Sequence, residues 1–306
     1  MRPTLHFLAG PTASGKTALA LAWAQEHGAA ILSCDAYCVY RGMDIGTAKP
    51  TLEEQKRVPH YGIDICEPGT AFSVGAYAAY STRIVEEVMA TRQPLLITGG
   101  SGFYLKSFFA PVTDQVEIPE PIRQSVEALE ASGGIAALLK RLDTLNPEGT
   151  GSLDRANPRR VVNALLRCEA SGLALRTLTE QFKSLPLPFS AYEKRVCLLE
   201  RTGDDLKSRV AQRTQQMLAS GLIDEVRRLR AAGLENNPTA ASAIGYRETL
   251  AHLAGAGDVQ WLHDSIALHT LQLIKKQRTW FRHQIPVDEV LTLSPGNDAE
   301  LQFGNE

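Results

Sequence analysis

A phosphate-binding loop lies close to the start of the chain. Residues 10–17, GPTASGKT, match the pattern G-x-x-x-x-G-K-[ST], between an apolar run at 5–9 and a helical pattern at 18–25. The glycines let successive backbone N–H groups point at phosphate oxygens, at the positive end of the following helix. Lys16 would add a positive charge, and Thr17 would reach a phosphate-bound Mg²⁺. A ligand with two or more phosphates is therefore expected here. The residues expected to hold it are Gly10, Pro11, Thr12, Ala13, Ser14, Gly15, Lys16 and Thr17.

The acid that holds Mg²⁺ in an ordinary nucleotide hydrolase is missing from its usual place. Such enzymes carry an Asp at the end of a second apolar strand, but here the apolar run 94–98 continues into GGSG at 99–102. The run 30–33 is followed by Asp35, which is the one acid at the carboxyl edge of an early strand, where α/β sheets bind ligands. Asp35 could hold the metal or act as a general base, and a plain helix cap is the alternative.

Basic and aromatic side chains are the other candidates for contacts to a ligand. Arg209 and Arg213 share a helix face and could meet a leaving diphosphate, although a solvated face is the simpler reading for Arg209. Thr47 and Lys49 are possible diphosphate donors. Two basic clusters could contact RNA phosphates or be ordinary helix surfaces. They comprise Arg155, Arg159, Arg160 and Arg167, and Lys275, Lys276, Arg278, Arg282 and His283. Three aromatic residues could stack on a base, and for Phe103 a place in the core is an equal alternative. These are Tyr37, Phe103 and Tyr104.

Composition narrows the class of protein. With 306 residues, 44% of them apolar and 22% charged, the chain suits one large soluble domain or a domain with an insertion. The net charge of −2 restricts any RNA contact to a local patch. Five scattered cysteines indicate free thiols in a reducing cytoplasm, and neither a leader nor a membrane-spanning apolar run is expected.

Alternating strand and helix patterns in the first hundred residues predict a parallel sheet of the P-loop α/β class, with helices on both faces. Prolines then bracket a helical stretch, in which Asn157 and Pro158 begin a helix that Gly172 ends. We therefore expect a catalytic core at 1–113 and 191–285, with a strand at 195–199, and a helical insertion domain at 114–190. The acidic tail at 286–306 is expected to be loosely held.

Several longer strings resemble the tRNA dimethylallyltransferases over nearly the whole chain, up to about residue 283. They are GPTASGKT (10–17), YRGMDIGTAKP (40–50), GGSGFY (99–104), RTQQMLASGLIDEV (213–226), AIGYRE (243–248) and KKQRTWFR (275–282). The GMDIGTAKP string is the most specific, since general P-loop proteins lack it.

The resemblance implies transfer of a dimethylallyl group from its diphosphate to N6 of the adenosine just 3′ of the anticodon, with Mg²⁺. It implies that Asp35 is the general base, that Ser101 lies near the reacting centre and that Arg213 neutralises the departing diphosphate. A monomer that clasps the anticodon stem-loop and flips the base into a channel is expected. The implied tRNA contacts are Asp35, Ala36, Tyr37, Cys38, Ser101, Arg123, Arg159, Arg160, Val161, Val162, Asn163, Lys275, Lys276, Gln277, Arg278 and Arg282.

The chain departs from the family pattern mainly on the side expected to face RNA. The family usually has Ser at the position of Ala36, Gln at that of Cys38 and Thr at that of Ser101. Three further positions, where the family usually has arginine, are Asn163, Leu271 and Lys276. Lysine cannot reproduce the bidentate fork of arginine. Three rivals therefore stay open: a free-nucleotide prenyltransferase of the AMP type, a small-molecule P-loop kinase, and a non-catalytic RNA-binding relative.

Overall fold

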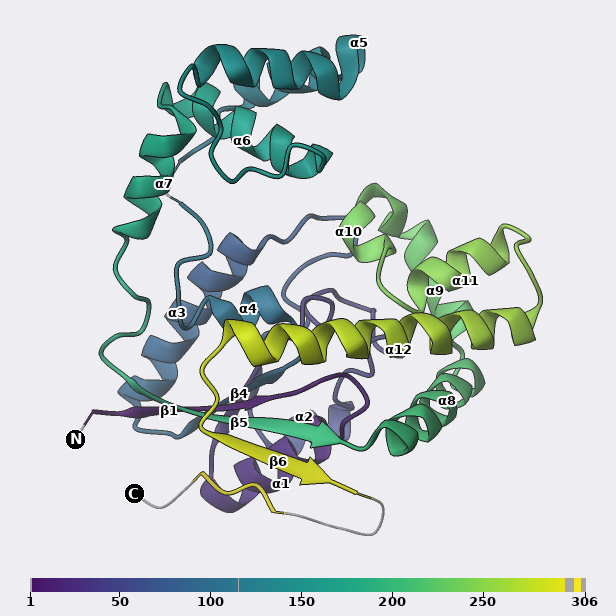
Figure 1. Cartoon of the computed structure of the whole chain (residues 1–306). Coiled ribbons are helices and arrows are strands. Elements are labelled where there is room, and N and C mark those ends of the chain that lie inside the picture. The colour runs from purple at the N-terminus through teal and green to yellow at the C-terminus, as the bar shows by residue number, and fades with distance from the viewer. Residues whose placement is uncertain (1, 115, 295–299, 304–306) are drawn as a thin grey trace. The chain divides into compact units, whose positions relative to one another are not determined.

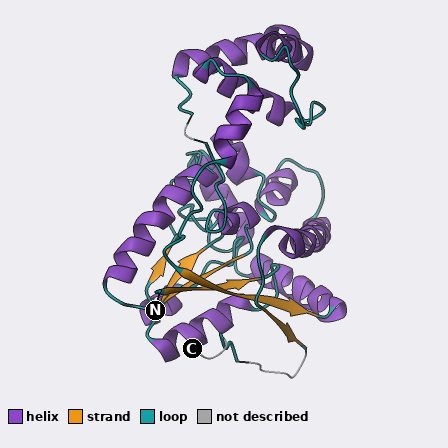
Figure 2. Cartoon of the chain, turned by 60° about the vertical axis from the view of Figure 1, so that its left-hand side comes forward, coloured by secondary structure: helices purple, strands orange, loops and turns teal. Residues whose placement is uncertain are grey.

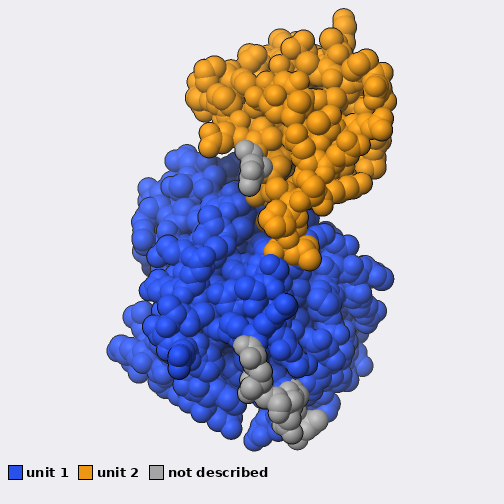
Figure 3. All heavy atoms as spheres, turned by 90° about the vertical axis from the view of Figure 1, so that its left-hand side faces the viewer, with its two compact units in different colours: residues 1–110, 188–306 blue, residues 111–187 orange. Residues whose placement is uncertain are grey.

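The computed structural model describes residues 2–114, 116–294 and 300–303. The chain divides into two compact units, the first comprising 1–110 with 188–306 and the second comprising 111–187 (Figure 3). The second unit falls within three residues of the insertion expected at 114–190.

A six-stranded sheet, parallel throughout, forms the centre of the first unit, in the order β3-β2-β4-β1-β5-β6. The strands are β1 (Thr4–Ala9), β2 (Ala30–Ser33), β3 (His60–Tyr61), β4 (Leu95–Gly99), β5 (Glu193–Arg201) and β6 (Glu289–Leu293). Side chains of a strand alternate between the two faces, so Leu5 and Phe7 of β1 join one apolar core while Leu8 joins the other. The predicted α/β class with a parallel sheet is confirmed.

Helices cover both faces of this sheet (Figure 1 and Figure 2). On one face lies α1, which packs through Trp23; on the other lie α3, α4 and α12. The helices of this unit are α1 (Lys16–His27), α2 (Leu52–Arg57), α3 (Val74–Ala90), α4 (Gly102–Lys106), α8 (Gly203–Ala219), α9 (Leu222–Ala231), α10 (Pro238–Ala241), α11 (Tyr246–Leu253) and α12 (Val259–Gln284), with a 3₁₀ turn at Leu234–Asn236.

The prediction of a loosely held tail is wrong for the part that the structure describes. Glu289–Leu293 forms β6, which pairs in parallel with β5. Leu293 and Leu301 are buried, and Phe303 lies edge-on against Trp23. The acidic composition hid a short strand, E-V-L-T-L, which its pairing with β5 and the burial of Leu293 stabilise. Residues 295–299 and 304–306 of the expected tail lie outside the described residues.

The second unit consists of α5 (Glu120–Leu145), α6 (Pro158–Ser171) and α7 (Leu175–Lys183), which share an apolar core of their own. The side chain of Asn157 caps α6, and Gly172 ends it with a left-handed φ of 68°, as predicted. Val161 is fully buried in this core and Val162 packs against it. The side chain of Val161 therefore has no surface with which to contact tRNA, while the contact expected at Val162, which is partly exposed, stays a prediction.

Candidate active site

The phosphate-binding loop joins β1 to α1 at the carboxyl edge of the sheet. Ala13 and Gly15 adopt left-handed φ values of 61° and 98°, and α1 starts at Lys16. Two arginines from the later part of the chain hold the loop: Arg201 Nε donates to the Ser14 carbonyl at 2.6 Å, and Arg209 Nε donates to the Ala13 carbonyl at 2.9 Å. The solvated-face interpretation of Arg209 is thereby corrected, since this guanidinium shapes the loop.

Lys16 lies beside this loop with its ammonium donating to the Pro11 carbonyl at 2.6 Å. Burial lowers the pKa of Lys16 to about 7; the carboxylate of Asp35 opposes that shift, and the positive charge of Arg213 adds to it. A cation with so few partners is poised to gain an anion, since a buried charge needs compensation.

The ends of β2 and β4 lie side by side and bring Asp35 and Ser101 together. Ser33 is in register with Thr98, and a Cβ on Gly99 would lie 2.1 Å from the Cys34 carbonyl oxygen, so only glycine allows this approach. Ser101 Oγ accepts from the backbone N–H of Ala36 at 2.8 Å. One oxygen of Asp35 accepts from the N–H of Tyr37 at 2.9 Å, which fixes the carboxylate.

Arg213, on α8, completes the charged part of the site. Its Nη2 donates to the Thr47 carbonyl at 3.3 Å. Burial lowers the pKa of Arg213 while the neighbouring Asp35 carboxylate raises it; arginine stays protonated at neutral pH regardless. The site thus brings the cations Lys16 and Arg213 to the Asp35 carboxylate.

Two pockets meet at these residues. A polar pocket of about 540 Å³ is lined by the phosphate-binding loop together with Thr17, Cys38, Arg209 and Gln212. An apolar pocket of about 400 Å³ is lined by Met217, Ile266, Leu273, Trp280 and Phe281, among others. Both volumes suit a small-molecule ligand. Six residues line both pockets: Thr12, Asp35, Thr47, Gly100, Arg213 and Gln277. A molecule with a charged head and an apolar body would therefore present the joint between them to Asp35.

Gln277 connects the two loops at this junction. Its carbonyl oxygen accepts from Thr12 N–H at 2.9 Å, and its amide nitrogen donates to the Gly100 carbonyl at 2.9 Å. The sequence indicated a tRNA contact at Gln277, whereas in the structure its side chain joins α12 to the phosphate-binding loop.

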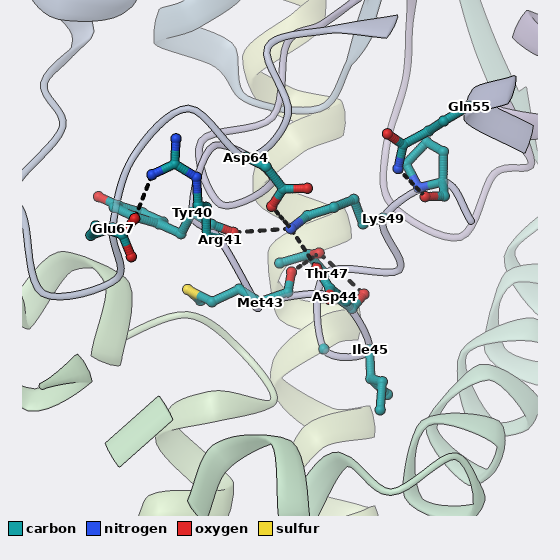
Figure 4. Close-up of polar contacts among 12 residues, drawn as sticks. Tyr40, Arg41, Met43, Asp44, Ile45, Thr47, Lys49, Gln55, Asp64 and Glu67 are labelled. Atoms are coloured by element: carbon teal, nitrogen blue, oxygen red, sulfur yellow. Dashed lines mark hydrogen bonds and ion pairs between the residues drawn. The ribbon is translucent and has the colours of Figure 1, made fainter. Parts of the chain in front are cut away.

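The diphosphate role suggested for Lys49 is wrong. Its ammonium is buried and donates to Asp44 at 2.5 Å, to Asp64 at 2.6 Å and to the Tyr40 carbonyl at 2.9 Å (Figure 4). Spacing could not reveal this, because Asp64 lies fifteen residues away in sequence.

Two of the aromatic candidates also differ from expectation. Tyr104 is buried and stacks on Tyr77 with ring centroids 3.9 Å apart, so it belongs to the core. Phe103 is 64% exposed at the rim of the apolar pocket, 6.4 Å between centroids from Trp280, and is therefore not core. Tyr37 lines the same pocket.

Burial raises the pKa of the Cys34 and Cys38 thiols, which keeps both protonated.

Many predicted RNA contacts already pair within the chain. In the second unit, Arg123 pairs with Glu120, Arg155 with Asp143, Arg160 with Asp154 and Arg167 with Asp114, while Arg159 and Asn163 are exposed. On α12, Arg278 donates to the Arg201 carbonyl and Arg282 pairs with Glu200 at 3.7 Å, whereas Lys275 and Lys276 are exposed. Exposed ion pairs contribute little stability, so these tRNA contacts stay predictions.

The donor chemistry at the polar pocket fits Mg²⁺ bound together with a phosphate ligand. Magnesium takes oxygen ligands and is commonly bound by one or two protein groups plus phosphates. The Thr17 hydroxyl and the Asp35 carboxylate both line this pocket. Among the described residues, no group of three or more His, Cys, Asp or Glu side chains could hold a metal by itself.

Comparison with known proteins identifies relatives over at least 90% of the chain. A family model described as IPP transferase matches residues 38–284. A "tRNA dimethylallyltransferase" of Opitutus terrae is 50% identical over 93% of this chain and 92% of its own length, and one of an Exiguobacterium species is 37% identical over 90% and 86%. Among solved structures, the tRNA isopentenylpyrophosphate transferase of Bacillus halodurans is 30% identical, covers 95% of this chain and 91% of its own, and has a TM-score of 0.67. A eukaryotic dimethylallyltransferase acting on tRNA shares the fold at 18% identity, 94% and 74% coverage and a TM-score of 0.79. No helix in the described residues is long and apolar enough to cross a membrane.

Proposed function

Because the chain belongs to the IPP transferase family, we propose that it transfers a dimethylallyl group from dimethylallyl diphosphate to N6 of the adenosine 3′ of the anticodon in tRNA. The curated relatives named tRNA dimethylallyltransferase match nearly the full chain, which supports this activity over that of a kinase or a non-catalytic RNA-binding protein. The observation that carries the assignment of residues is the junction of the polar and apolar pockets at Asp35 and Arg213.

In this proposal the diphosphate lies in the polar pocket. The loop N–H groups, Lys16 and Arg213 bind its oxygens, so charge that develops as the allylic C–O bond breaks meets fixed cations. Mg²⁺, when bound, would neutralise further diphosphate charge, and Thr17 would hold it. The dimethylallyl chain and the target base share the apolar pocket, which keeps the reacting carbon away from water.

Asp35 takes the proton. The lone pair of adenine N6 is delocalised into the ring, so the amine becomes nucleophilic only when its proton leaves as the new C–N bond forms. The carboxylate is already oriented by the Tyr37 N–H, and Ser101 lines the same pocket. The products are N6-dimethylallyladenosine in tRNA, diphosphate and a proton. A monomeric enzyme in the cytoplasm is part of the proposal.

The test is to incubate the protein with labelled dimethylallyl diphosphate, Mg²⁺ and either bulk tRNA or AMP. Label is expected in tRNA, at the adenosine 3′ of the anticodon. Label in AMP alone would replace the proposal with the free-nucleotide prenyltransferase.

A further inference from the structure

A buried glutamate holds the loop segment on which Arg213 rests. The segment 44–47, the D-I-G-T part of the most specific motif, carries the Thr47 carbonyl that accepts from Arg213. Glu225, on α9, is 2% exposed. Its Oε2 accepts from the N–H of Asp44 at 3.2 Å and of Ile45 at 2.8 Å, and its Oε1 accepts from the N–H of Gly46 at 3.3 Å.

A tyrosine supplies the fourth hydrogen bond to the Glu225 carboxylate. The Tyr246 hydroxyl donates to Glu225 Oε1 at 2.6 Å. The ring of Tyr246 lies so close to the segment that a Cβ on Gly46 would come within 2.4 Å of it. All four groups that donate to Glu225 are uncharged, and such an array is what a carboxylate needs when it leaves water without a counter-cation.

Lys49, whose charge is opposite to that of Glu225, also binds the segment 44–47. It binds the side chain of Asp44 (Figure 4), while Glu225 accepts from the backbone N–H of the same residue. A segment of four residues is thus fixed by two buried charges from different parts of the chain. Neither charge lines the polar or the apolar pocket, so fixing the segment, and not binding the ligand, is the consequence of this arrangement.

We infer that Glu225 is a positioning residue for Arg213: by fixing residues 44–47 it sets the Thr47 carbonyl and so aims the guanidinium at the diphosphate. The inference rests on the proposed function for the identity of the ligand. A misplacement of about 1 Å can cost on the order of 10²-fold at a site of this kind, so Glu225 acts on diphosphate binding without touching it.

A double-mutant cycle on inorganic pyrophosphate affinity tests this, because coupling between two positions appears as non-additivity. Glu225→Gln should weaken pyrophosphate binding on the order of tenfold in the wild-type background, the equivalent of one charged hydrogen bond. In the Arg213→Ala background the same change should have almost no effect. Equal effects in both backgrounds, or no effect in the wild type, would overturn the inference.

Two further variants separate positioning from general destabilisation. Tyr246→Phe removes a single hydrogen bond to Glu225 and should cause a smaller loss that is likewise absent without Arg213, which keeps the test available if Glu225→Gln does not fold. Glu248→Gln is the matched control: Glu248 is equally buried, but it accepts from Gly245, Arg247 and His269. It should lower the melting temperature and leave pyrophosphate affinity unchanged. If coupling is found but labelled donor never reaches tRNA, the proposed function fails and the positioning role stands.

Discussion

The affinity for the prenyl donor should fall as pH rises through neutrality, because of Lys16. Burial lowers the pKa of this ammonium to about 7 in the free protein. The protonated fraction then falls from about nine-tenths at pH 6 to about one-tenth at pH 8. A diphosphate stabilises the protonated form in the complex, so donor binding should be about tenfold weaker at pH 8 than at pH 6.

Isothermal titration calorimetry with dimethylallyl diphosphate, in the absence of tRNA, measures this directly. Titrations at pH 8 in buffers of different ionisation enthalpy should show uptake of about one proton on binding. Two variants control for the titration of the ligand itself: Lys16→Arg keeps a permanent charge, and Lys16→Ala removes it. Both should lack the wild-type excess pH dependence. Parallel pH profiles for the wild type and Lys16→Ala would refute the assignment of Lys16 to the donor.

Three other predictions address the acid, the apolar pocket and the last strand. Asp35→Ala should lower the single-turnover rate of prenyl transfer by roughly 10²–10⁴-fold while calorimetry shows donor binding retained; near-normal rates on tRNA would contradict the general-base role. Leu273→Trp places a larger side chain at a partly exposed position of the apolar pocket. It should reduce kcat/KM for the donor on the order of tenfold and leave the affinity for pyrophosphate unchanged. A parallel loss of pyrophosphate binding would place the prenyl chain elsewhere. Leu293→Ala should reduce the free energy of unfolding in urea by about 2–5 kcal/mol, against less than about 0.5 kcal/mol for Val290→Ala on the exposed side of the same strand; equal losses would show that β6 contributes no core.

The parts of the site that lie on one stretch of chain could be predicted from the sequence. The phosphate-binding loop, its flanking strand and helix, and Asp35 after β2 follow from local pattern and from the rule that ligands bind at the carboxyl edge of a parallel sheet. The caps of α6 follow from Asn157 and Gly172 for the same local reason.

The predictions that were wrong concern residues whose partners lie far away in the sequence. Arg201 and Arg209 bind loop carbonyls almost two hundred positions away, and Gln277 joins α12 to Thr12 over 265 positions. In sequence Lys49 resembles a surface lysine, because its partner Asp64 lies fifteen positions away. The segment 289–293 forms a strand because it can pair with β5, despite its acidic surroundings. The sequence alone does not reveal that β5 has an edge available for this pairing. One signal was available for Gln277: it falls on the same side of the late helix as the apolar residues, not with the outward-facing lysines.

The two arginines outside the phosphate-binding loop have a consequence for how the loop meets its ligand. In a trans peptide the C=O and the following N–H point in opposite directions, so a guanidinium that holds a carbonyl also fixes the direction of the next N–H. Arg201 and Arg209 therefore fix the amides of Gly15 and Ser14 while the chain folds. Because these hydrogen bonds lie within the protein, the loop keeps its shape without an anion. Ligand binding then avoids the loss of conformational entropy that ordering a flexible loop would cost. Such a loop should show fast, single-step association, with a rate set by diffusion and by the field of its cations.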